Sequence, residues 1–282
     1  MLIDLSLIPL TKCNMNCPFC YLGDMRRDKF ITPIETIKNA IKPYNIRLLD
    51  IYGGEISLLD ENYVDDLISL FPEMEINIVT NGVGFTNSPW MKYLDRLHIS
   101  ISYDLLRPQL DKVKQTIEYF ETHNIGYNII SVDCGELDYD YLNQLDGLNS
   151  LSIKPFSKSI YQSNNYKTPY MLEIYRKIYS EYPKLKRKLE QVTEYRDKIP
   201  HWFLIKGELY DIRYDDNGCE YFCPKNIIDD ESPHRVYNKC LSCKYLHKCF
   251  NEHTDYYRPV KNQECLGRIR TLEYLDALSD LY

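Results

Sequence analysis

Residues 2–20 read LIDLSLIPLTKCNMNCPFC. The apolar run over 2–9 predicts a β-strand, and three cysteines follow it, Cys13, Cys17 and Cys20. Three cysteines within eight residues do not form a disulfide framework, because the number is odd and the loop is short. Thiolates are the ligands of iron–sulfur clusters, and the next cysteine, Cys134, lies more than one hundred residues away. The triplet therefore predicts a four-iron cluster with one iron left open for chemistry, and a zinc knuckle is the alternative.

The composition predicts a folded, cytoplasmic protein. The chain has 282 residues, ten cysteines, 44% hydrophobic residues and a net charge of −7. It contains neither an export signal nor an apolar run of the roughly 18 residues that a membrane span needs, so we expect no membrane association. Without export, the cysteines are expected to stay reduced and to bind metal. The acidic balance argues against a nucleic acid or an anionic membrane as a partner.

Strand-like and helix-like patterns alternate along residues 1–192, which we expect to form the first domain. Strands are expected at 2–9, 46–52, 75–80, 97–103, 126–133 and 150–155. Helices are expected at 33–43, 59–70, 88–94, 106–123, 138–147 and about 167–190. Six such units predict an α/β fold, a partial (β/α)6 barrel of parallel strands, with ligands at the carboxyl ends of the strands.

Residues 193–282 follow a different pattern. The regular periodicity fades, and six of the ten cysteines lie between 219 and 265. We expect a small cysteine-rich C-terminal domain that needs metal to fold, because it has little apolar core of its own.

The spacing Cys-x3-Cys-x2-Cys, with Phe19 before the last cysteine, resembles the signature of the radical S-adenosylmethionine (SAM) superfamily. The resemblance implies a [4Fe-4S] cluster on the three cysteines, whose open iron chelates the amino and carboxyl groups of SAM, with Phe19 at the cofactor. It also implies reductive cleavage of SAM and release of a 5′-deoxyadenosyl radical.

A second motif closes the second expected strand. Tyr52-Gly53-Gly54-Glu55 resembles the Gly-Gly-Glu motif of the same superfamily, which implies that Gly53, Gly54 and Glu55 hold the methionine amino end of SAM. Two glycines let a backbone approach a ligand closely, and a carboxylate accepts hydrogen bonds from an ammonium group. Taken alone, the same tripeptide is an ordinary turn.

Polar residues also lie at the carboxyl ends of the expected strands at 97–103 and 75–80. Ser100, Ser102 and Asp104 share one strand face, and they resemble the superfamily's ribose-contacting strand end, with Ser102 the first candidate. Such residues also line wet barrel interiors. Thr80-Asn81-Gly82 recurs in relatives as well, and we interpret it only as a turn. No adenine contact is predicted, because the glycine-rich pattern of strand five is not recognisable.

The C-terminal region contains a second set of cysteines, Cys219, Cys223, Cys240, Cys243, Cys249 and Cys265. Their spacing resembles the SPASM/twitch extension of radical SAM enzymes, which implies one or two auxiliary [4Fe-4S] clusters. The last four cysteines suffice for one cluster, and the first two, with His253 as a candidate third ligand, would make a second, incomplete site with an open position. His253 stands where the pattern has a cysteine, and 202–208 lack the cysteine expected upstream. A structural zinc site is the alternative.

Other candidates carry less information. Cys134 follows the fifth expected strand, where a thiol could donate a hydrogen atom to a substrate radical; the alternative is a small buried hydrophobe. Asp211, Asp215 and Asp216 are candidate bases, and nothing in their spacing ranks them.

The resemblance implies a radical SAM enzyme, an oxidoreductase or peptide-modifying enzyme, that abstracts hydrogen from carbon in a peptide or protein. The outcome would be a crosslink, an oxidation or an epimerisation. One alternative is a dehydrogenase or epimerase of a small molecule, such as a sugar, nucleoside or amino acid. Another is a non-catalytic, zinc-bound binding module. The enzyme hypothesis also implies an electron donor such as flavodoxin or ferredoxin.

Overall fold

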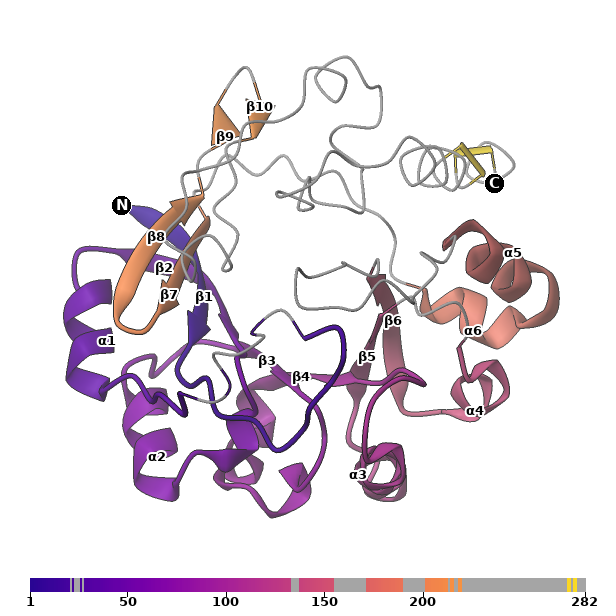
Figure 1. Ribbon diagram of the computed structural model, residues 1–282, viewed down its shortest axis with the longest axis horizontal. Helices are drawn as coiled ribbons and strands as arrows, with labels where there is room; N and C mark the ends of the chain where they lie inside the picture. Colours follow the sequence, from indigo (N-terminus) through magenta and orange to yellow (C-terminus); the bar gives the residue numbers. More distant parts are fainter. Residues whose placement is uncertain are drawn as a thin grey trace.

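The computed structural model contains one eight-stranded sheet with helices outside it (Figure 1). It describes residues 1–20, 22, 26, 28–132, 137–154, 171–189, 201–212, 214–215, 218–219, 273–274 and 276–277. Along the sheet the strands follow the order β6-β5-β4-β3-β2-β1-β7-β8.

The first six strands lie side by side in chain order. They are β1 (Leu2–Ile8), β2 (Asn45–Ile51), β3 (Ile76–Thr80), β4 (Leu97–Ser102), β5 (Tyr127–Val132) and β6 (Leu148–Lys154). Each neighbouring pair among them is parallel. The predicted α/β class and the partial barrel of parallel strands are therefore confirmed. Parallel order also brings the carboxyl ends of all six strands to one edge, where their loops can meet.

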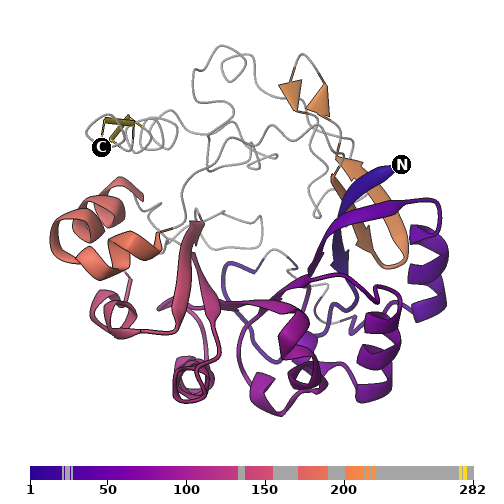
Figure 2. The same cartoon turned by 180° about the vertical axis from the view of Figure 1, so that it is seen from behind.

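Helices cover the outer side of the curved sheet in both views (Figure 1 and Figure 2). They are α1 (Ile34–Ile41), α2 (Glu61–Ser69), α3 (Leu110–Thr122), α4 (Tyr139–Gln144), α5 (Met171–Glu181) and α6 (Pro183–Lys188). The helix predicted over 88–94 is a 3-10 helix, Pro89–Arg96. The single helix predicted over about 167–190 is wrong, because α5 ends before Pro183 and α6 begins there. Proline lacks the N–H that a continuing helix requires, yet it fits a first turn.

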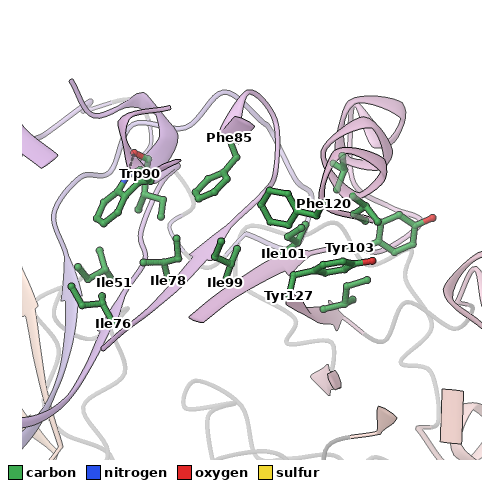
Figure 3. Packing of buried hydrophobic residues seen from close by; sticks show 14 of the residues in the cluster. Ile51, Ile76, Ile78, Phe85, Trp90, Ile99, Ile101, Tyr103, Phe120 and Tyr127 are labelled. Carbon is green, nitrogen blue, oxygen red and sulfur yellow. Dashed lines mark hydrogen bonds between the residues drawn. The ribbon is translucent and has the colours of Figure 1, made fainter. Parts of the chain in front are cut away.

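The main core lies between the sheet and these helices (Figure 3). Isoleucines of β3 and β4 point away from the barrel interior, and aromatic side chains from the outer segments pack over them. The rings of Phe85 and Phe120 meet edge to face with centroids 6.1 Å apart. Trp90 is fully buried, and its indole N–H donates to the carbonyl of Ile56 at 2.9 Å. This packing holds the outer layer against the sheet.

The opposite face of the sheet is polar. Asn77 on β3 donates to the Asp50 carboxylate on β2 at 2.9 Å, and Ser150 on β6 donates to the Asn128 side chain on β5 at 2.9 Å. Ser100 on β4 lies in register with Asn128 on β5 and with Val79 on β3. The barrel interior therefore carries hydrogen-bonding groups beside apolar residues such as Val79 and Ile130, whereas the outer face is mainly apolar.

A hairpin extends the sheet at β1. Strand β7 (His201–Ile205) pairs in parallel with β1, and β8 (Glu208–Ile212) pairs antiparallel with β7. Lys206 and Gly207 both have positive φ, as two-residue hairpin turns require. Residues 201–212 thus continue the first sheet, although the sequence pattern places them after the predicted boundary at 192. A separate small ladder joins β9 (Tyr214–Asp215) and β10 (Gly218–Cys219).

Among the described residues, no helix combines the length and the apolar character that crossing a bilayer requires.

We predict that Trp90→Ala lowers the free energy of unfolding by about 3–5 kcal/mol, because it leaves a large cavity and an unpaired carbonyl at Ile56. Trp90→Phe should cost less, since it refills part of the volume. Urea unfolding followed by circular dichroism measures both. Tyr119→Ala is the matched control, because 37% of Tyr119 is exposed, and its cost should stay within about 1 kcal/mol. Equal losses in the two alanine variants would contradict the assigned core.

Candidate active site

The cysteine loop, defined as residues 11–20, follows β1 at the carboxyl edge of the sheet. Its base is anchored by two backbone hydrogen bonds, from Thr11 to the Phe30 carbonyl at 2.9 Å and from Thr32 to the Pro9 carbonyl at 2.8 Å. Cys13, Cys17 and Cys20 are free thiols, with Cys17 buried and the other two half-buried. The three predicted ligands therefore share one anchored loop.

The Gly-Gly-Glu segment after β2 supports this loop. The N–H of Gly54 donates to the Leu10 carbonyl at 2.9 Å, and the N–H of Glu55 donates to the Lys12 carbonyl at 2.8 Å. A Cβ atom on Gly54 would lie 1.9 Å from the Lys12 carbonyl oxygen, a distance that only glycine avoids. Gly53 has φ +145°, a conformation that L side chains rarely adopt. Both glycines are therefore required for the approach of the cysteine loop.

Glu55 links the ends of β2 and β3. Its carboxylate accepts three hydrogen bonds, from Ser57 N at 3.0 Å, from Thr80 Oγ1 at 2.6 Å and from Asn81 N at 2.6 Å. Burial raises the pKa of Glu55, and these three donors oppose the rise. The Ser57 side chain also lowers this pKa, so the carboxylate already receives most of the hydrogen bonds that it can accept. Glu55 also lies near enough to Cys13 to influence the pKa of that thiol.

Asn81 contacts the cysteine loop, a role that the sequence pattern did not reveal. Its Nδ2 donates to the Asn14 side chain at 2.7 Å and lies 3.6 Å from the Sγ of Cys13. Asn14 in turn donates to the Val83 carbonyl at 3.2 Å. The sequence Thr80-Asn81-Gly82 predicts only a turn, and in the structure this turn also contacts a predicted cluster ligand, Cys13.

The loop after β4 makes two more contacts of this kind. Gln109 donates to the Asn14 carbonyl at 3.0 Å, and Arg107 Nη1 donates to the Sγ of Cys17 at 3.6 Å. The Arg107 guanidinium lies 5.2 Å from the centroid of the Phe19 ring. The sequence pattern did not predict Arg107 or Gln109 as residues of the site. Only their position directly after β4, close to Asp104, indicates that they could reach it.

The three polar residues predicted on β4 have different environments. Ser100 and Ser102 are half-buried on the face opposite the main core. Asp104 is buried, and its Oδ2 accepts from Arg107 Nε at 3.1 Å and Nη2 at 2.9 Å. Its Oδ1 has no hydrogen-bond partner within the described part of the chain. Burial raises the pKa of Asp104, and Arg107 opposes the rise. Any contact of these residues with a ribose remains a prediction.

The donor set fits an iron–sulfur cluster by its chemistry. Three thiols share one loop, and polar hydrogens reach two of the sulfurs, including the Met15 N–H, 3.4 Å from the Sγ of Cys13. Burial raises the pKa of Cys17 to about 11 and also raises the pKa of Cys13. Metal uptake therefore releases protons from these thiols. No three His, Cys, Asp or Glu side chains in the described ranges lie close enough to hold one metal ion, so this fit rests on donor chemistry.

Several predicted site residues lie outside the described residues. They are Cys134, Asp216, Cys223, Cys240, Cys243, Cys249, His253 and Cys265. Asp211, Asp215 and Cys219 are described only as members of strands β8, β9 and β10. Their predicted roles therefore remain predictions.

We predict that Gly54→Ala prevents full loading of the cluster on Cys13, Cys17 and Cys20. The added methyl group meets the Lys12 carbonyl, so the cysteine loop must move, at a cost of about 1–3 kcal/mol. Iron and sulfide analysis after anaerobic reconstitution, with the visible absorbance of the cluster, measures the loss. Gly84→Ala is the control: it has φ +80° but no atom within 4 Å of the added methyl group. It should lose stability and keep its iron, and equal iron content in both variants would contradict the prediction.

Comparison with known proteins agrees with this geometry. Residues 7–132 match the family model of the radical SAM superfamily. The fold resembles that of Streptococcus suis SuiB bound to S-adenosylmethionine, with a TM-score of 0.61, 17% identity, and coverage of 88% of this chain and 72% of that chain. The structure of SuiB bound to precursor peptide SuiA gives a TM-score of 0.60 at 16% identity, covering 95% of this chain and 69% of that one. These structural similarities concern the fold.

Curated protein sequences show no match to the chain. The SPASM- or twitch-like assignment of residues 193–282 is not tested by these comparisons and remains a prediction. The family match and the barrel agree with the motifs at Cys13–Cys20 and Gly53–Glu55. Residues 7–132 therefore belong to the radical SAM superfamily.

Proposed function

We propose that the chain is a radical SAM enzyme that abstracts a hydrogen atom from carbon in a peptide or protein substrate. Superfamily membership supports an enzyme that uses a [4Fe-4S] cluster and SAM. The observation that carries the proposal is the anchored cysteine loop, which presents three free thiols beside the Gly-Gly-Glu segment. When bound, the reduced cluster supplies one electron that cleaves SAM to methionine and a 5′-deoxyadenosyl radical, which takes hydrogen from the substrate.

The chain's own residues would bind and orient SAM. Cys13, Cys17 and Cys20 hold the cluster, while Gly53, Gly54 and Glu55 receive the methionine amino end. Support for Glu55 comes from its burial at this edge of the sheet and from the hydrogen bond of its N–H to the Lys12 carbonyl in the cysteine loop. Ser102 is the proposed ribose contact, because its hydroxyl lies on the polar inner face near the carboxyl end of β4.

A peptide substrate is the finer part of the proposal. The fold resembles SuiB, whose structure with the precursor peptide SuiA covers 95% of this chain. The polar inner face, with its Asp50–Asn77 and Asn128–Ser150 pairs, offers donors and acceptors that backbone amides can meet. The product would be a crosslinked, oxidised or epimerised peptide.

The part of residues 193–282 that follows β8, from Cys219 to Cys265, is proposed to hold one or two auxiliary clusters in a SPASM- or twitch-like domain. Such a cluster would accept the second electron when a substrate radical is oxidised. The first electron would come from a protein such as flavodoxin or ferredoxin.

The reconstituted protein should convert SAM to 5′-deoxyadenosine when reduced with dithionite under anaerobic conditions. Liquid chromatography with mass spectrometry measures the product. Cys20→Ala should abolish it, because the cluster loses one of three ligands. Iron analysis of the same sample should give at least about four irons per chain. A filled cluster that forms no 5′-deoxyadenosine would refute the enzyme proposal and favour a binding module.

Substrate class can be tested with cell fractions from the source organism. A peptide fraction should raise the rate of 5′-deoxyadenosine formation above the rate with SAM alone, because hydrogen abstraction from the substrate consumes the radical and favours further cleavage of SAM. The small-molecule fraction should leave the rate unchanged. Cys20→Ala controls for background breakdown of SAM. Acceleration by the small-molecule fraction alone would replace the peptide by a sugar, nucleoside or amino acid.

A further inference from the structure

The loop after β4 places a charged group against a predicted cluster ligand. Arg107 Nη1 lies 3.6 Å from the Sγ of Cys17, while its Nε and Nη2 bind one oxygen of Asp104. The Arg107 side chain is only 10% exposed and that of Asp104 is fully buried. Phe19 lies along the guanidinium, with its ring centroid 5.2 Å away. The positive charge is therefore largely removed from water where it meets the sulfur.

The backbone of this loop holds the guanidinium in place. The N–H of Arg107 donates to the Asp104 carbonyl at 3.1 Å, which closes a turn and sets the two side chains next to each other. Pro108 restricts Arg107, and Gln109 follows with φ +58° and donates to the Asn14 carbonyl. The loop thus contacts the cysteine loop at two points, Asn14 and Cys17.

A fixed cation beside a cluster ligand favours the reduced cluster. Reduction adds one negative charge, and the attraction between that charge and a guanidinium is stronger at a buried site than in water. Hydrogen bonds to the sulfurs, net charge and solvent exposure are the factors that set the potentials of iron–sulfur clusters. Arg107 supplies a hydrogen bond to sulfur and a positive charge. Together with Phe19, it also limits the exposure of the site to solvent.

We propose that the Asp104–Arg107 pair sets the reduction potential of the cluster on Cys13, Cys17 and Cys20, with Arg107 raising the potential and Asp104 lowering it. Both are positioning residues that act through the sulfur of Cys17. This inference rests on the proposed function in one respect only: it requires that the cluster be bound to Cys13, Cys17 and Cys20. It gives Asp104 a role other than the ribose contact expected from the sequence, because one of its oxygens is already bound by the guanidinium.

The test is an anaerobic redox titration of the reconstituted protein without SAM, followed by electron paramagnetic resonance. The signal to follow is the one that changes when SAM is added to a separate sample, because only a cluster with an open iron can respond. Arg107→Gln should shift the midpoint potential to more negative values, since the cation next to the Cys17 sulfur is then lost. Asp104→Asn should shift it to more positive values, since the guanidinium then acts alone. The double variant should lie between the two.

Two controls make the result specific. Arg107→Lys retains the charge without the planar fork, so it should shift the potential less than Arg107→Gln. Lys38→Gln removes one positive charge from an exposed position on helix α1. Its potential should match that of the wild type because solvent screens that site.

The outcomes separate this inference from the proposed function. Full iron content with unchanged potentials in Arg107→Gln and Asp104→Asn would overturn the inference, even if SAM binding weakens. If Arg107→Gln fails to hold the cluster, the potential of Asp104→Asn decides alone. A wild-type chain that takes up no cluster would instead overturn the proposed function, and with it the premise for Arg107.

Discussion

The contact between the cysteine loop and the Gly-Gly-Glu segment is the constraint on which the site depends. Two backbone hydrogen bonds, from Gly54 to Leu10 and from Glu55 to Lys12, bring the loop so close that no side chain fits at position 54. Once the loop lies there, its outer part reaches the ends of β3 and β4. Gly53 and Gly54, which the motif assigns to ligand binding, thus also allow the cysteine loop to pack against the segment after β2.

Each strand from β1 to β4 contributes one polar segment to the same edge of the sheet. β1 leads into the thiols, β2 leads to the buried Glu55, β3 is followed by Asn81, and β4 leads to Asp104 and Arg107. Carboxylates and one guanidinium lie around sulfurs that are themselves buried or half-buried. Charges in such surroundings interact strongly because little water separates them. The site therefore combines a rigid backbone frame with an electrostatic environment that residues outside the ligand set determine.

The sequence predicted the parallel sheet, the position of the cysteine triplet on one loop after β1, and the position of Glu55 after β2. These follow from periodicity and from residues that are adjacent in the chain. The sequence did not predict the contacts of Asn81, whose Asn-Gly pair is common in turns. Nothing in the pattern around Arg107 connects it with Cys17, since the two are 90 positions apart. The ion pair of Asp104 with Arg107 was likewise not predicted from the sequence pattern. The division of the predicted helix 167–190 into α5 and α6 could have been predicted from Pro183, but the helix-like charged pattern on both sides favoured one continuous helix.

The residue types and their order establish the donor chemistry: three thiolates on a short loop, two glycines and a carboxylate after the second strand, and alternating strands and helices. Folding decides which of these groups touch. Asn14 receives hydrogen bonds from residues 67 and 95 positions further along the chain, and only the side-by-side order of β1 to β4 brings them together. The physical reason is that parallel strands gather their carboxyl ends at one edge. Distances across that edge depend on packing of the whole sheet, which no local pattern encodes.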